Sequence, residues 1–134
     1  MPINIRWFDD QQRIVLWEFE GAWTMDELHA TFTKSHNMCL EVPQNKVIAL
    51  ADTTGSAGHP VPSNIFSALT SRTRSHAPNF DMAVIVTTNP IIKGFINIMK
   101  TVPAVSKKFM VTSTREAALE FIQKRQAQQT LNTG

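Results

Sequence analysis

The chain has 134 residues, which is the length of one ordinary domain. Apolar residues make up 43% of it and charged residues 18%, so a globular core is expected and a disordered chain is excluded. Lys and Arg total 13 against 11 Asp and Glu, a net charge of +2, which excludes a general polycation that binds nucleic acid.

The cysteine content and the apolar runs indicate where the protein resides. Cys39 is the one cysteine, so no disulfide can form within the chain, as is usual in a reducing compartment. The first ten residues lack the basic stretch leading into an apolar run that marks a secretory signal. Apolar runs such as residues 47–51 are too short to span a bilayer. We therefore expect a cytoplasmic protein with no membrane span.

The first two strands are predicted to form a hairpin. Residues 3–7 alternate between apolar and polar side chains, and residues 9–12, Asp-Asp-Gln-Gln, are typical of a turn. In residues 14–19 both faces are apolar apart from Glu18, which is typical of a central strand covered on both sides.

Helices and strands are predicted to alternate after the hairpin. Thr24 and Glu27 match a capping box that starts a helix running to about Leu40. Strands follow at residues 46–52, 82–87 and 108–112, and a second helix is expected to begin at Ser63. Asn89 followed by Pro90 predicts the start of a third helix.

The C-terminal segment is predicted to hold one more helix and a tail. Ser113 and Glu116 match a second capping box, and the helix that follows is expected to fray into residues 126–129. We predict one α/β domain over residues 1–125 and a disordered tail over 126–134. The order ββαβαβαβα predicts a mostly parallel five-stranded sheet with an N-terminal antiparallel hairpin, covered by helices.

This topology also predicts where a ligand would bind. In open α/β sheets, ligands bind beyond the carboxyl ends of the strands, and helix N-termini at the same edge favour an anion. The loop from Asp52 to Ser63 is the longest and most polar one there. The candidate binding rim consists of eight residues: Trp23, Asp52, Thr53, Thr54, His59, Ser63, Thr88 and Asn89.

For several of these candidate residues, a purely structural role is the alternative to a role in binding or catalysis. Asp52 could bind backbone N–H groups of its loop or, paired with His59, act in a small hydrolase. Ser63 is an N-cap or a phosphorylation site. His29 and His36 lie two turns apart without a third ligand, so we expect no metal. The nucleotide-binding glycine loops and Gly-x-Ser-x-Gly are absent, so no catalytic residue and no cofactor are assigned.

The segment Ile14-Val-Leu-Trp-Glu-Phe-Glu-Gly-Ala-Trp-Thr-Met-Asp-Glu-Leu resembles the opening of SpoIIAA-like (STAS/SEC14-type) bacterial proteins. In that family a hairpin leads through a Gly-x-Trp-Thr-like turn into the first helix, and the buried strand ending in Ala51-Asp52 also fits its pattern. The resemblance implies the STAS fold and a regulatory or binding module. It also implies a phosphorylated serine or threonine near the second helix, for which Ser63 and then Thr54 match by place.

These observations lead to one functional expectation with two alternatives. We expect a non-enzymatic STAS-like module that binds a protein partner or a small ligand at the rim. The alternatives are binding of a lipid or other hydrophobic small molecule, as the SEC14 side of the resemblance implies, and the hydrolase that uses Asp52 and His59. Ile91 and Ile98 would leave apolar surface on the third helix, from which we expect a homodimer.

Overall fold

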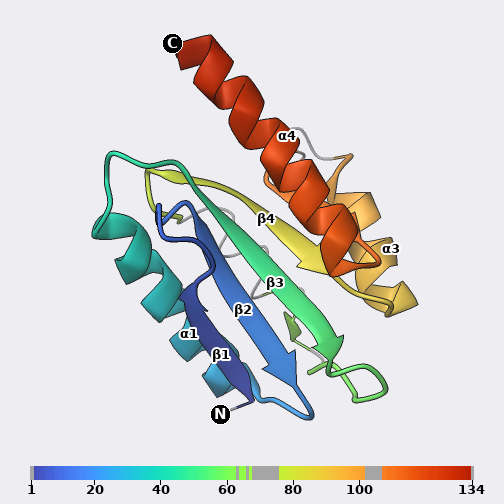
Figure 1. The fold of residues 1–134 in the computed structure, drawn as a ribbon. Helices are drawn as coiled ribbons and strands as arrows, with labels where there is room; N and C mark the ends of the chain where they lie inside the picture. The colour runs from blue at the N-terminus through green and yellow to red at the C-terminus, as the bar shows by residue number, and fades with distance from the viewer. Residues whose placement is uncertain (1, 63, 66, 68–75, 102–106, 134) are drawn as a thin grey trace.

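A computed structural model describes residues 2–62, 64, 65, 67, 76–101 and 107–133, and a five-stranded sheet forms its centre. The strands are β1 (Ile3–Trp7), β2 (Ile14–Glu20), β3 (Val47–Gly55), β4 (Phe80–Val86) and β5 (Phe109–Thr112), of which Figure 1 labels β1 to β4. The helices in the described residues are α1 (Met25–Leu40), α3 (Pro90–Met99) and α4 (Arg115–Thr133). None of these helices has both the length and the apolar character needed to cross a bilayer.

The strands lie side by side in chain order. β1 is antiparallel to β2, and β2, β3, β4 and β5 run parallel to one another. The predicted α/β class, the N-terminal hairpin and the mostly parallel five-stranded sheet are thereby confirmed. The helix predicted to begin at Ser63 lies mostly outside the described residues.

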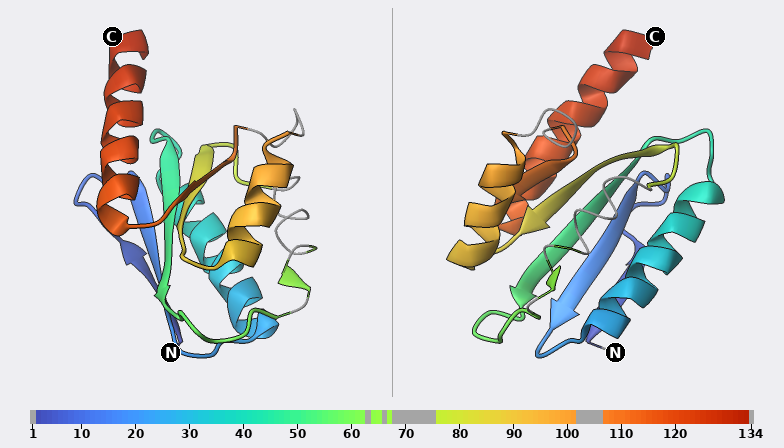
Figure 2. Two further views of the ribbon diagram at one scale, coloured as in Figure 1. Left: turned by 90° about the vertical axis from the view of Figure 1, so that its right-hand side faces the viewer. Right: turned by 180° about the vertical axis from the view of Figure 1, so that it is seen from behind.

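The helices form two layers, one on each face of the sheet. Right-handed crossovers between neighbouring parallel strands place their helices on the same face. The edge-on view in Figure 2 shows α1 and α3 on one face and α4 on the other. We call these the α1/α3 face and the α4 face.

Each face has its own core. On the α4 face, alternate residues of the strands are large and aliphatic, and Ala118 and Ile122 of α4 pack on them; the strand residues are Ile14, Leu16, Ile48, Leu50, Met82, Val84 and Val86. On the α1/α3 face the strands contribute a mixture of aromatic rings, alanines and β-branched side chains, against which Phe32 and Ile96 pack from the helices. Full burial of a side chain such as Ile96 or Ile122 contributes about 1.5–3 kcal/mol.

The start of α1 confirms the predicted capping box, whereas the start of α4 differs from the prediction. The Thr24 hydroxyl accepts from the backbone N–H of Glu27, and the Glu27 carboxylate accepts from that of Thr24. At α4 it is the Thr114 hydroxyl that accepts, from the backbone N–H of Ala117. The predicted box of Ser113 and Glu116 is therefore wrong by one residue.

The C-terminal segment differs from the predicted disordered tail, because α4 continues to Thr133. Asp81 at the start of β4 accepts two hydrogen bonds from Arg125, at 2.7 and 2.8 Å, and one from Gln129 at 2.8 Å. These contacts join residues at least 44 positions apart, so a local sequence pattern does not reveal them.

β3 ends later than predicted, at Gly55, so Thr53 and Thr54 belong to the strand and not to the loop that follows Asp52. The Thr53 hydroxyl donates to the carbonyl oxygen of Val86 at 2.7 Å, and Gly21 N–H donates to the carbonyl oxygen of Gly55 at 3.0 Å. These bonds extend the sheet beyond the point at which the apolar pattern ends.

Candidate functional site: an apolar pocket on the α1/α3 face

Asp52 is a structural ion-pair partner at the carboxyl end of the sheet. Its Oδ1 accepts from the Thr54 hydroxyl at 2.6 Å and from the Thr54 backbone N–H at 3.0 Å. Its Oδ2 accepts from Nε of Arg115 at 2.8 Å. Burial alone would raise the pKa of Asp52, but the hydrogen bonds from Thr54 and Arg115 outweigh it and hold this pKa below its ordinary value. The carboxylate is thus ionised and fully engaged.

The other loop candidates are not gathered around Asp52. His59 is exposed, and its backbone N–H donates to the carbonyl oxygen of Ser56. Within the described residues no hydrogen bond joins its imidazole to Asp52, so the pair required by the hydrolase alternative is not formed. Asn89 caps α3, with its side chain accepting from Ile91 N–H at 2.9 Å, and Thr88 is exposed. Ser63 lies outside the described residues.

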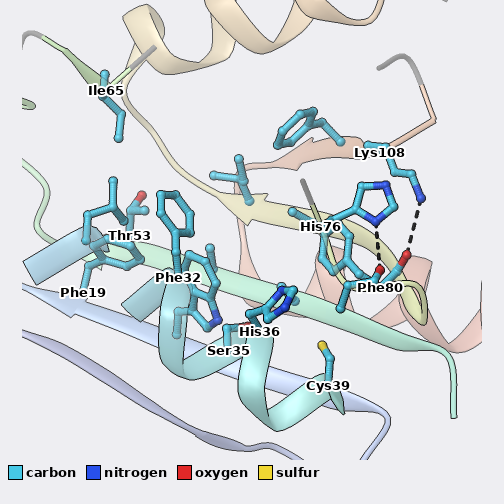
Figure 3. Close-up of a pocket in the computed structure, with 18 of the residues that line it drawn as sticks. Phe19, Phe32, Ser35, His36, Cys39, Thr53, Ile65, His76, Phe80 and Lys108 are labelled. Atoms are coloured by element: carbon cyan, nitrogen blue, oxygen red, sulfur yellow. Dashed lines mark hydrogen bonds between the residues drawn. The ribbon is translucent and has the colours of Figure 1, made fainter. Parts of the chain in front are cut away.

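A pocket lies on the α1/α3 face, between the sheet and the helices, and has a volume of about 140 Å³. Figure 3 shows Phe19, Thr53 and Ile65 at one end, Ser35 and His36 of α1 along one side, and Cys39, His76 and Lys108 at the other end. Two of the predicted rim residues, Trp23 and Thr53, contribute to its lining. The pocket nevertheless extends under the helices rather than across the loops.

Three alanines form the floor of the pocket. Ala49 and Ala51 alternate with Ile48 and Leu50 along β3, so this strand presents small side chains to the α1/α3 face and large ones to the α4 face. Ala83 stands opposite Ala49 on β4 and is only half-buried, although it lies within a central strand. Small side chains at these three positions leave space that the neighbouring large ones do not fill.

Aromatic rings surround this floor. Trp17 lies opposite Ala51 on β2 and packs edge-on against Phe32 of α1, with ring centroids 5.4 Å apart. Trp23, just before α1, packs in the same manner against Phe19 at 5.2 Å. Such contacts fix the rings in place. The walls of the pocket are therefore rigid and apolar.

The described lining residues expose little polar surface to the pocket. The indole Nε1 of Trp17 is buried and has no hydrogen-bond partner in the described part of the chain. At the end formed by β4 and β5, the Lys108 amine donates to the carbonyl oxygen of Asp81 at 3.1 Å and to that of Phe80 at 3.4 Å. His76 Nδ1 lies 2.9 Å from the carbonyl oxygen of Ala77. Figure 3 shows the contacts of Lys108 with Phe80 and of His76. Burial lowers the pKa of Lys108, and the charge of Asp81 opposes this shift. Burial also raises the pKa of Cys39 to about 11, so its thiol is neutral.

Sequence reasoning missed most of this pocket. Its signal was present in the order Ile48-Ala49-Leu50-Ala51, in which every second residue is small. A pattern based on hydrophobicity treats alanine and leucine alike as buried strand residues. Side-chain volume is the property that distinguishes the two faces of β3.

In comparisons with known proteins, the chain matches no protein-family model, no curated protein and no solved structure. No three potential ligands among the described His, Cys, Asp and Glu residues gather into a metal site. The site is therefore defined by its own geometry, as a small apolar pocket in a five-stranded α/β domain.

Proposed function

We propose that the chain is a non-enzymatic binding module of the STAS type, which holds one small apolar molecule in the pocket between α1 and α3. The observation that carries the proposal is the floor of three alanines enclosed by aromatic rings. Protein interiors contain few voids larger than a water molecule, so a hollow of this size beside the core of the α1/α3 face supports a ligand site. An apolar pocket with few polar groups is the usual form of a small-molecule site.

The volume of the pocket limits the size of its ligand. An apolar cavity of about 150 Å³ holds a molecule such as benzene, whereas drug-sized ligands occupy about 300–1,000 Å³. At about 140 Å³ the pocket suits a single six-membered ring or a short branched chain. This favours a small hydrophobic molecule over a lipid with two acyl chains.

The charged groups of the pocket and of the predicted rim support binding rather than catalysis. Asp52 is saturated by Thr54 and Arg115, and Lys108 is engaged with backbone carbonyl oxygens. Within the described residues, no hydrogen bond joins the His76 imidazole to the Cys39 thiol. A nucleophile with its base within hydrogen-bond reach, which covalent catalysis requires, is not formed by these side chains.

Binding of methylenecyclohexane, an uncharged six-membered ring, tests this proposal. We expect it to raise the melting temperature of the protein and to shift the NMR signals of Ala49, Ala51 and Ala83. The variant Ala83→Leu adds three carbon atoms to the floor and should weaken binding at least tenfold while the protein stays folded. Ala117→Leu, the same change at an exposed position of α4, is the matched control and should bind as the wild type does.

Two outcomes would overturn the proposed function. One is that neither methylenecyclohexane nor its ketone analogue cyclohexanone binds to the wild-type protein. The other is that Ala83→Leu and Ala117→Leu bind the probe equally well, because the probe would then occupy another surface.

A further inference from the structure

We propose that the natural ligand of this pocket is an uncharged molecule with one hydrogen-bond acceptor oxygen, and that this oxygen accepts from the indole N–H of Trp17. The inference rests on the proposed function, because it names the ligand class of the same pocket. It follows from one unpartnered donor and from the charges of the described lining residues.

Trp17 provides the donor. Its side chain lines the pocket, the residue is 9% exposed, and its Nε1 has no hydrogen-bond partner within the described residues. Buried tryptophans ordinarily find a partner for this N–H, since a buried donor left unpaired loses its hydrogen bond to water without replacement. A ligand oxygen that reaches this nitrogen, which the surrounding side chains cover in the unliganded protein, would restore that bond.

The indole is held in place before any ligand arrives. Trp17 lies in β2, between β1 and β3, with Ile5 opposite on one side and Ala51 on the other. Phe32 packs edge-on against its ring from α1. Because the donor is already oriented, little conformational freedom is lost when an acceptor binds.

The charge of the lining indicates that the ligand is neutral. No Asp or Glu is among the described lining residues, so these residues offer no counter-charge to a cationic ligand. Among the described lining residues the charged one is Lys108, which precedes β5, and β5 lies three strand spacings or about 14 Å from β2 and the backbone of Trp17. An anion in an apolar site needs several donors, and the indole supplies one. A carbonyl or ether oxygen needs only one.

A matched pair of probes tests this inference. Cyclohexanone and methylenecyclohexane have nearly the same shape, and only the ketone has an acceptor oxygen. The wild-type protein has three indole N–H signals in a nitrogen–proton correlation spectrum, from Trp7, Trp17 and Trp23, which the single Trp→Phe variants assign. We expect the ketone to move the Trp17 indole proton downfield, and the alkene to leave it without this hydrogen-bond shift.

Affinities in the variants give an independent readout. Trp17→Phe should weaken cyclohexanone binding about tenfold relative to methylenecyclohexane, which corresponds to the loss of one hydrogen bond. The alkene controls for any change in pocket shape, and Trp7→Phe controls for the loss of an indole outside the pocket and should leave both affinities unchanged. Cyclohexanecarboxylate, the anionic probe, should bind more weakly than the ketone.

The result that overturns the inference differs from the one that overturns the proposed function. If methylenecyclohexane binds but the ketone leaves the Trp17 signal unmoved, or if Trp17→Phe weakens both probes equally, the pocket binds apolar molecules without this hydrogen bond. Tighter binding of cyclohexanecarboxylate than of the ketone would also overturn it. If neither uncharged probe binds, the proposed function itself fails.

Discussion

Arg115 and Asp52 join the last helix to the centre of the sheet, with Nε of the guanidinium 2.8 Å from Oδ2 of the carboxylate. The same guanidinium contacts Glu18 on β2 through Nη2 at 2.9 Å. Arg115 is the first residue of α4, so this pair fixes the point at which the helix begins to cross the sheet. The acidic residue that ends the buried part of β3 therefore serves the α4 face and not the pocket.

Replacing Arg115 by methionine should destabilise the protein. Methionine keeps the apolar stem but leaves Asp52 buried without its counter-charge. Removal of one partner from a fully buried pair costs about 3–5 kcal/mol, and we expect about 2 kcal/mol here because the Arg115 side chain is 35% exposed. Urea unfolding at neutral pH measures the loss. Arg6→Met, which removes the exposed partner of Glu18, is the control and should cost under about 0.5 kcal/mol; equal losses in the two variants would contradict this account.

The contact between Arg125 and Asp81 should make stability depend on pH below about 4. Burial alone would raise the pKa of Asp81, but the hydrogen bonds from Arg125 and Gln129 outweigh it and hold this pKa below its ordinary value. A carboxylate with a lowered pKa in the folded state contributes stability above its unfolded pKa of about 3.9 and loses it as the pH falls through the folded value.

Arg125→Met tests this dependence. At pH 7 the variant should lose about 2 kcal/mol of unfolding free energy, because the buried carboxylate keeps its charge and loses its bidentate partner. The difference from the wild type should shrink as the pH falls from about 5 to 2, where Asp81 is protonated in both proteins. Lys124→Met, which removes an exposed pair with Glu120, should show little loss at any pH. A difference that stays constant across this range would show that Arg125 acts through packing alone.

The sequence alone predicts those helices and strands whose patterns involve only residues close together in the chain. The alternation at residues 3–7 predicts β1, and the pairing of Thr24 with Glu27 predicts the start of α1, because both depend on residues a few positions apart. The extent of α4 was not predictable in this way. The second half of this helix is held by hydrogen bonds from Arg125 and Gln129 to Asp81. Asp81 lies at the start of β4, at least 44 positions earlier in the chain.

The candidate site was likewise predictable from the sequence only in part. The rule that ligands bind beyond the carboxyl ends of parallel strands identified Trp23 and Thr53, which do line the pocket. It did not identify Trp17, whose importance comes from the hydrogen bond that its N–H lacks. The packed structure decides whether a hydrogen-bond donor finds a partner. The composition of the chain and the spacing of its residues therefore cannot show that Nε1 of Trp17 lacks one.

Cys39 should be nearly inert to alkylation in the folded protein. Its pKa of about 11 leaves about one thiol in a thousand ionised at pH 8, compared with about a quarter for an ordinary cysteine. We expect iodoacetamide to react at least a hundredfold more slowly with the folded protein than with the protein in concentrated urea, and the folded rate to rise about tenfold per pH unit between pH 8 and 10.

The position of Cys39 in the pocket lining gives this experiment a second use. Saturation with methylenecyclohexane should slow the alkylation further, as followed by mass spectrometry, whereas the rate in urea should not change. A folded-state rate that is equal to the unfolded one would show that the thiol is open to solvent and would contradict its burial.

Two glycines should respond to alanine substitution with opposite signs. A Cβ at Gly55 would fall far inside van der Waals distance of the carbonyl oxygen of Phe19, where the register between β2 and β3 shifts. Gly55→Ala must therefore move one backbone segment, and we expect a loss of about 2 kcal/mol in urea unfolding. A Cβ at Gly94, exposed in α3, meets no atom within 4 Å. Gly94→Ala should stabilise the protein by about 0.5–1 kcal/mol, because alanine loses less conformational freedom in a helix.

The Gly55 variant should also affect the pocket, since Phe19 and Thr53 line the end next to this contact. A shift of β2 against β3 would displace both side chains, so Gly55→Ala should weaken the binding of methylenecyclohexane, whereas Gly94→Ala should not. Both affinities can be measured by titration of the protein NMR signals under conditions in which each variant is folded. If Gly55→Ala lost stability but bound the probe as the wild type does, the strand contact and the pocket would be independent of each other.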